Sequence, residues 1–229
     1  MGLKRMVWRS TGAGLVIDTV KNIKEEGAIG SGLKRVMKEN ICEDNPITSR
    51  IYKMVHKGTR KRGASGQIEE KTYSEEIAKA ISQFLEKDDW EYFWDEENGV
   101  FSFGLKINKE IKTIDYLILV NKDSYTVNGY VTVGGNADDP EMMAELAEFI
   151  CRANSGLLCG NFELDYVDGT VTYKTYTYCE DMTVSPANIS HSIFTIVGMF
   201  QKYGKGILDV ISGKLSALDA IDECEEKEE

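Results

Sequence analysis

Two short turn signals, Asn98-Gly99 and Asp168-Gly169, constrain the fold of this chain more than any other feature of its sequence. Each lies between two segments in which apolar and polar residues alternate, and this pattern predicts a β-hairpin. With two residues in each turn, one register per hairpin gives an apolar face and pairs opposite charges on the other face. These registers place Trp94 opposite Phe103 and Glu91 opposite Lys106 in the first hairpin, and Leu164 opposite Tyr173 and Glu163 opposite Lys174 in the second.

Two further strands are expected between the hairpins. The dense apolar run Ile114–Val120 predicts a central strand that is covered on both faces. Residues 125–133 predict the strand that follows, and the pair Asn128-Gly129 marks either a tight turn or a bulge within it. Because strands that are joined by hairpins run antiparallel, the sheet is predicted to be antiparallel.

Helices precede, separate and follow the strands. Apolar residues at helical spacing predict one helix from Ile77 to Leu85, before the first hairpin. Capping residues before a proline mark two more helix starts, at Asp138 or Asp139 and at Ser185. A last amphipathic helix carries Ile207, Val210, Ile211, Leu215, Leu218 and Ile221. The order helix, four strands, helix, two strands, helix predicts the α+β class, with helices packed on one face of the sheet.

Charge divides the chain into two parts. Residues 1–72 hold 15 basic and 8 acidic residues, whereas residues 73–229 hold 12 basic and 30 acidic residues. We therefore expect a basic helical N-terminal extension and linker over 1–72, and an α+β domain with a C-terminal amphipathic helix and an acidic tail over 73–229. The apolar stripes of the extension are too thin to enclose a core, so they must pack on the main domain, on a second copy or on a partner. These stripes are Val16, Val20 and Ile23; Leu33, Val36 and Met37; and Ile47, Ile51, Met54 and Val55.

Composition excludes several classes of protein. The net charge of -11 and the pI near 4.8 argue against a general nucleic-acid binder, because phosphate neutralisation needs a basic surface. No apolar run approaches the roughly 18 residues of a membrane span, and the N-terminus lacks the apolar region of a secretory signal. Five scattered cysteines are typical of reduced thiols rather than of a disulfide framework, so the expected location is cytoplasmic.

No motif for catalysis or cofactor binding emerges from the sequence. The two histidines, His56 and His191, belong to no recognisable triad, and helix capping accounts for Asp138-Asp139. The segment GMFQKYGKG, from Gly198, has one residue too many for a phosphate loop and Gly206 where Ser or Thr belongs. The cysteine spacings fit no zinc site. We therefore expect no catalytic residue, no cofactor and no metal, and a protein that is not an enzyme.

The stretch from Trp90 to about Val210 resembles the YbjN family, whose members are often described as bacterial sensory transduction regulators. The resemblance rests on the aromatic strand DDWEYFWDEENGVFSF, the helix DDPEMMAELAEFICRANSGL and the hairpin GNFELDYVDGTVTYKTYTY. The family pattern of that hairpin is filled by Gly160, Phe162, Asp165, Gly169, Val171, Tyr173 and Thr175. The resemblance implies a fold similar to type III secretion chaperones and a non-catalytic protein that binds other proteins, often as a dimer.

Aromatic side chains on one face of the predicted sheet suggest an interaction surface. If the helices cover the face that bears Trp94, then Phe93, Tyr176 and Tyr178 stand on the other face. Such residues are favoured at contact sites, although the N-terminal helices are an equally good cover for this face. The apolar stripe Ile207, Ile211, Leu215 and Leu218 extends the candidate surface and favours a homodimer. The sequence therefore predicts a chaperone- or adaptor-like interaction module with an unidentified protein partner. The alternative is a sensor that binds a small molecule or peptide between sheet and helices.

Overall fold

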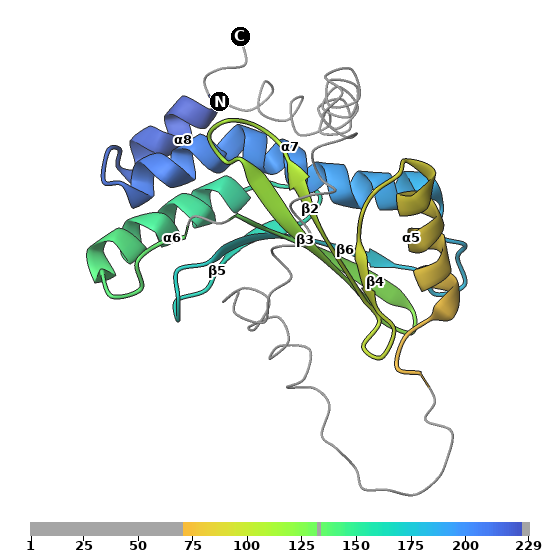
Figure 1. The fold of residues 1–229 in the computed structure, drawn as a ribbon. Coiled ribbons are helices and arrows are strands. Elements are labelled where there is room, and N and C mark those ends of the chain that lie inside the picture. The colour runs from red at the N-terminus through yellow and green to blue at the C-terminus, as the bar shows by residue number, and fades with distance from the viewer. Residues whose placement is uncertain (1–70, 132–133, 226–229) are drawn as a thin grey trace, which may run out of the picture.

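The computed structural model describes residues 71–131 and 134–225 (Figure 1). The helices predicted within the N-terminal extension, with all their apolar stripes, lie outside the described residues. The last four residues of the acidic tail also lie outside them. The extension and its stripes therefore stay predictions.

The described chain is an α+β unit in which the helices and strands follow the predicted order. Its elements are α5 (Glu75–Lys87), β1 (Phe93–Asp95), β2 (Val100–Lys106), β3 (Thr113–Val120), β4 (Ser124–Val131), α6 (Pro140–Asn154), β5 (Asn161–Leu164), β6 (Val171–Tyr178), α7 (Pro186–Ile211) and α8 (Ala217–Glu225). The six strands form one sheet in the order β1-β2-β3-β4-β6-β5, and every neighbouring pair is antiparallel. The α+β class and the antiparallel sheet are thus confirmed.

Local capping residues fix where the helices begin. The Ser74 side chain accepts the backbone N–H of Ile77 at the start of α5, and the Asp139 side chain accepts that of Met142 at the start of α6. At the start of α7, Ser185 and Asn188 form a reciprocal capping box, and proline occupies the first helical position. The starts of α6 and α7 agree with the sequence prediction because a cap is a purely local signal.

Both hairpin turns contain four residues rather than the two that the sequence predicts. In the first, the Asp95 carboxylate accepts the backbone N–H groups of Glu97 and Asn98, both at 3.1 Å, and Gly99 N–H donates to the Asp95 carbonyl at 2.9 Å. In the second, Asp165 and Gly169 make the same closing bond at 2.7 Å. Each glycine has a left-handed backbone, with φ near +70°. An aspartate four residues before a glycine therefore sets the loop length.

The longer loops shift both predicted registers by two residues. Trp94 lies opposite Phe101 and Phe162 lies opposite Tyr173. Because side chains alternate with a period of two, a shift of two residues leaves every side chain on its predicted face.

The two predicted charge pairs have different outcomes. Lys174 and Glu163 form an ion pair across β5 and β6, as diagonal rather than directly opposite neighbours. The pairing of Glu91 with Lys106 is wrong. Glu91 precedes the three-residue strand β1, and Lys106 pairs with Thr113 of β3.

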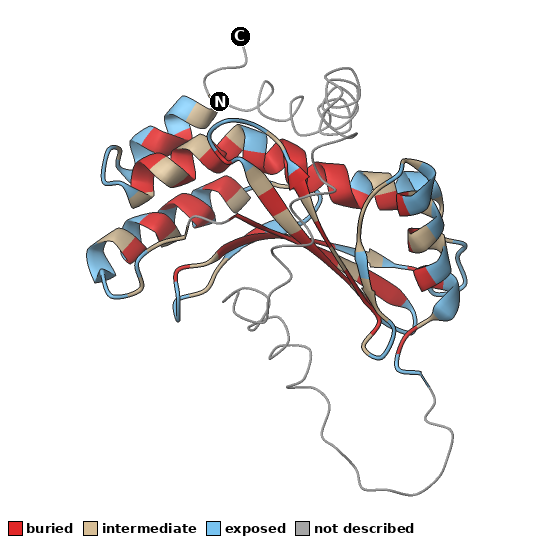
Figure 2. Ribbon diagram, viewed as in Figure 1, coloured by how far each residue is buried: buried red, intermediate tan, exposed pale blue. Residues whose placement is uncertain are grey.

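All the described helices lie on one side of the sheet, with the long helix α7 running across it (Figure 1). Figure 2 shows buried residues concentrated along α7 and the central strands. Polar groups fasten α7 to the sheet: Tyr116 Oη donates to the Ile193 carbonyl at 3.1 Å, and Tyr125 Oη lies 3.2 Å from Ser192 Oγ. Burial raises the pKa of Tyr116 well above its usual value, so this hydroxyl stays a neutral donor.

Asn128-Gly129 is neither a turn nor a bulge, because both residues continue the ladder of β4. Gly129 faces α7, and a Cβ atom there would collide with the side chain of Ile196. This glycine therefore marks a place where helix and sheet approach closely, a role that its local sequence does not distinguish from a turn.

Helix α7 continues to Ile211 without a break, whereas the sequence predicts two helices over this stretch. Two glycines inside it permit close packing. A Cβ atom at Gly204 would lie 2.6 Å from Ile111, and one at Gly206 would lie 2.7 Å from Phe149. The following helix α8 packs on α7 and α6, and Glu145 of α6 accepts the Ala217 N–H at 2.7 Å.

Candidate functional site

The sheet has two unlike faces. The helix face carries the side chains that pack under the described helices, among them Phe101, Tyr116 and Val127. The outer face carries the alternate residues of the same strands. No described helix covers the outer face, which is therefore the candidate site.

The centre of the outer face is an apolar cluster of its own. Val100, Leu117 and Tyr130 are each less than a tenth exposed, and the half-buried Leu119 packs against them. The prediction that the run Ile114–Val120 is buried on both faces is thus confirmed at Leu117. Burial also raises the pKa of nearby Asp115, because desolvation disfavours the charged carboxylate.

Exposed aromatic side chains flank this centre on both sides. Phe93 of β1 is 49% exposed, and Tyr176 and Tyr178 of β6 are 60% and 50% exposed. The register places all three on the outer face, opposite to the helices. Their predicted face and exposure are therefore confirmed, and the structure joins them to a buried centre that the sequence analysis did not assign to the surface. We call Phe93, Val100, Leu117, Leu119, Tyr130, Tyr176 and Tyr178 the outer-face patch.

The second part of the predicted surface, on the last helices, does not form an exposed stripe. Ile207 is fully buried beneath neighbouring helices, so its prediction as a surface residue is wrong. Ile211 and Leu215 are half-buried against the same core, and Leu218 is 49% exposed on α8. The cause is that α7 runs on through Gly204 and Gly206, and α8 folds back over it. The apolar stripe that was expected to favour a dimer is thus partly buried in the core of the same chain.

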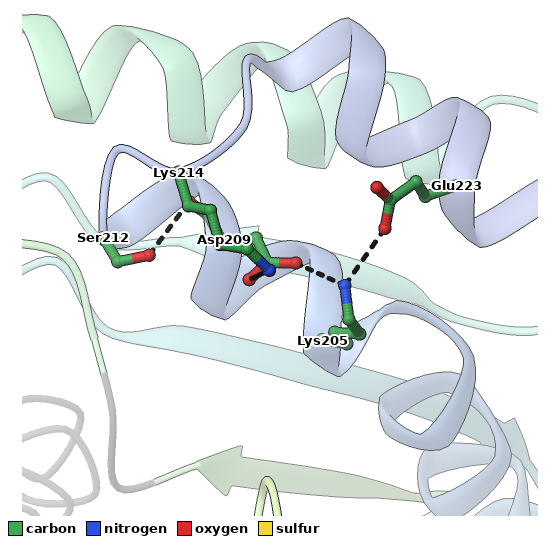
Figure 3. Close-up of polar contacts among 5 residues, drawn as sticks. All are labelled: Lys205, Asp209, Ser212, Lys214 and Glu223. Atoms are coloured by element: carbon green, nitrogen blue, oxygen red, sulfur yellow. Dashed lines mark hydrogen bonds and ion pairs between the residues drawn. The ribbon is translucent and has the colours of Figure 1, made fainter.

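A polar cluster holds the turn between α7 and α8 (Figure 3). The nearly buried Asp209 carboxylate accepts Lys205 Nζ at 2.5 Å and Lys214 Nζ at 2.9 Å, and Lys205 also contacts Glu223 of α8 at 3.0 Å. The hydrogen bond from Lys205 is the main reason that the pKa of Asp209 is lowered. Because each charge here has a partner of opposite sign, we interpret the cluster as structural.

A cleft of about 340 Å³ lies at the end of the sheet near β6 and the first turns of α7. Its lining includes Cys159, Gly160 and Asn161 before and at the start of β5, Thr175, Tyr176 and Thr177 of β6, and His191 and Ser192 of α7. His191 Nε2 lies 3.5 Å from Cys159 Sγ. Among the described residues no group orients the other ring nitrogen, so this pair lacks the third member of a catalytic triad.

The cleft could not be predicted from the sequence, because its walls are far apart along the chain. Cys159 and His191 are separated by 32 residues, and neither has a neighbouring motif. A local signal near the cleft is Gly160, which directly precedes β5 and has a left-handed backbone (φ +78°).

Two further observations concern the described residues alone. They contain no group of three His, Cys, Asp or Glu side chains arranged to hold a metal ion. Their helices are also too short or too polar to span a bilayer.

Fold and site together define a class: an α+β protein whose antiparallel sheet is covered by helices on one side and carries an aromatic patch on the other. In comparisons with known proteins, no protein-family model matches the chain and no curated protein matches it. The resemblance to the YbjN family therefore stays a prediction.

Proposed function

We propose that this protein is a non-enzymatic protein-interaction module, chaperone- or adaptor-like, with a regulatory role. The observation that carries the proposal is the outer-face patch, in which exposed aromatic rings flank a buried apolar centre. Exposed aromatic side chains are typical of protein interfaces, because they bury large areas at low entropic cost on binding.

The partner is proposed to be a protein rather than nucleic acid or membrane. The net charge of -11 opposes the binding of polyanions. The resemblance to the YbjN family supports the same proposal, because it implies a non-catalytic protein that binds other proteins, often as a dimer.

The proposal is tested by affinity purification from the native cell, with quantitative mass spectrometry. The test variant changes Phe93→Ser and Tyr178→Ser, which removes two exposed rings from the outer face. The matched control is Tyr166→Ser, because Tyr166 is as exposed as Tyr176 but lies in the turn between β5 and β6. We expect a specific partner to be lost from the test variant and retained by the control. Equal recovery of the partner from both variants would show that the outer face does not bind it.

A second candidate function is a sensor for a small molecule or peptide. It is favoured by the cleft beside β6, which is bordered by both the sheet and helix α7. A ligand in this cleft would raise the melting temperature of the wild type, by mass action. The replacement of Ser192 by a bulky Phe would abolish that rise.

A further inference from the structure

Among the described strands, β5 alone pairs with the edge of β6 that faces away from β4, and it covers only half of that edge. Strand β6 has eight residues, and β4 pairs with nearly all of them on one side. On the other side, β5 pairs with Val171 to Lys174 alone. Gly160 then turns the chain away, so no described strand pairs with the outer edge from Thr175 to Tyr178.

The direction of the backbone groups along this edge follows from two contacts. The Thr170 carbonyl accepts the Asp165 N–H at 2.9 Å, on the β5 side. A Cβ atom at Gly160 would collide with the Lys174 carbonyl, which therefore points to the same side. Because backbone groups alternate along a strand, the N–H and C=O groups of Tyr176 and Tyr178 point outward as well.

The outward groups of Tyr176 border the cleft described above. Thr175, Tyr176 and Thr177 form one of its walls, and His191 and Ser192 of α7 lie across from them. The site thus combines backbone hydrogen-bond donors and acceptors, spaced as they are along a strand, with an adjacent cleft. An edge with these features is a template for one more strand.

We propose that an extended segment of a partner protein binds here, antiparallel to β6, and continues the line of β5. The inference rests on the proposed protein-binding function and names the form of the partner. Unpaired backbone groups on an edge are matched by another extended backbone, which supplies the complementary donors and acceptors.

The register also sets which side chains the segment needs. Residues opposite Tyr176 and Tyr178 lie on the outer face, where apolar or aromatic side chains extend the outer-face patch. The intervening residue points toward the cleft beside Ser192 and His191, where small polar side chains match the hydroxyl groups. The segment therefore alternates large apolar and small polar residues.

The critical variant is Tyr176→Pro. It removes one outward N–H and leaves the ladder with β4 intact, because the Tyr176 N–H does not point toward β4; proline is tolerated in this situation. The matched control is Tyr176→Ala, which removes the ring but keeps the N–H.

The probe is a library of short random peptides, selected for binding to the full-length chain. We expect selected peptides to lose at least about tenfold in affinity for Tyr176→Pro, because the wild-type bond is lost and a peptide carbonyl is left unpaired. For Tyr176→Ala we expect a smaller loss. In the wild type, the amide hydrogens of Tyr176 and Tyr178 should exchange rapidly when free and slowly with peptide bound, as followed by NMR.

Four results would overturn the inference. The first is a selection that yields no binding peptide, and the second is equal affinity for wild type and Tyr176→Pro with no slowing of exchange. The third is a wild-type dimer that Tyr176→Pro converts to a monomer, which would assign the edge to a second copy. If the cellular partner is lost from the outer-face variant yet retained by Tyr176→Pro, the proposed function stands and the edge site fails.

Discussion

The two faces of the sheet are built from the same strands, yet they differ in how their apolar residues are buried. On the helix face, burial is nearly complete from β2 to β6, because the long helix α7 and its neighbours lie over it. On the outer face, the buried apolar residues are confined to a centre around Leu117, and aromatic rings stand exposed beyond it. The helix face therefore stabilises the domain, whereas the outer face keeps exposed apolar surface that can contact a partner. This difference is what separates a structural surface from a candidate binding surface.

The sharpest test of this comparison uses two adjacent residues of β3 that point to opposite faces. Ile118 is fully buried on the helix face, and Leu117 is buried on the outer face. We expect Ile118→Ala to lower the free energy of unfolding by about 4 kcal/mol and Leu117→Ala to lower it by about 2 kcal/mol, as measured by urea denaturation. Equal costs would mean that the outer face is covered as fully as the helix face.

Two strand glycines provide a second paired test. Gly129→Ala should lower the free energy of unfolding by about 1–3 kcal/mol, because the new methyl group collides with Ile196 under α7. Gly104 lies on the outer face, and a Cβ atom there would be 3.4 Å from Asp115 Oδ1, an acceptable contact. Gly104→Ala should therefore change stability by less than about 0.5 kcal/mol. A tolerated alanine at Gly129 would show that α7 does not approach the sheet this closely.

The polar cluster beneath α8 gives a prediction for pH. The pKa of Asp209 is lowered in the folded chain, chiefly by the hydrogen bond from Lys205. A carboxylate with a lowered folded pKa contributes stability above its unfolded pKa of about 3.9, and this contribution is lost as pH falls through the folded pKa. Asp209→Asn should cost about 1 kcal/mol at pH 7 and should make the stability curve flatter below about pH 4. A cost that persists unchanged at pH 2 would contradict the assignment.

The smallest effect is expected on the outer face itself. Tyr178→Ser removes a ring that is half exposed, so the free energy of unfolding should change by less than about 0.5 kcal/mol. Partner binding should nevertheless weaken, as proposed above. A marked loss of stability, measured by thermal unfolding, would show that this ring packs within the chain rather than serving a contact.

The face of each strand residue could be predicted from the sequence, but the hairpin registers could not. Alternation fixes the face because its period is two, and it cannot distinguish registers that differ by two residues. The registers are set by the Asp95 and Asp165 carboxylates, which close four-residue loops. At the candidate site, Phe93, Tyr176 and Tyr178 were predicted on the correct face of the sheet. Ile207 was wrongly placed on the surface, because its burial depends on helices that are packed in the tertiary structure.

The sequence by itself determined the order of the elements, the starts of α6 and α7 and the two faces of the sheet. Each of these depends on residues within a few positions of one another, such as caps, turn glycines and alternating side chains. The tertiary structure alone decided that Gly129, Gly204 and Gly206 are sites of close packing. It also decided that Cys159 and His191 meet beside the part of the β6 edge that no described strand pairs. These features join residues that are distant along the chain, and such contacts leave no periodic pattern in the sequence.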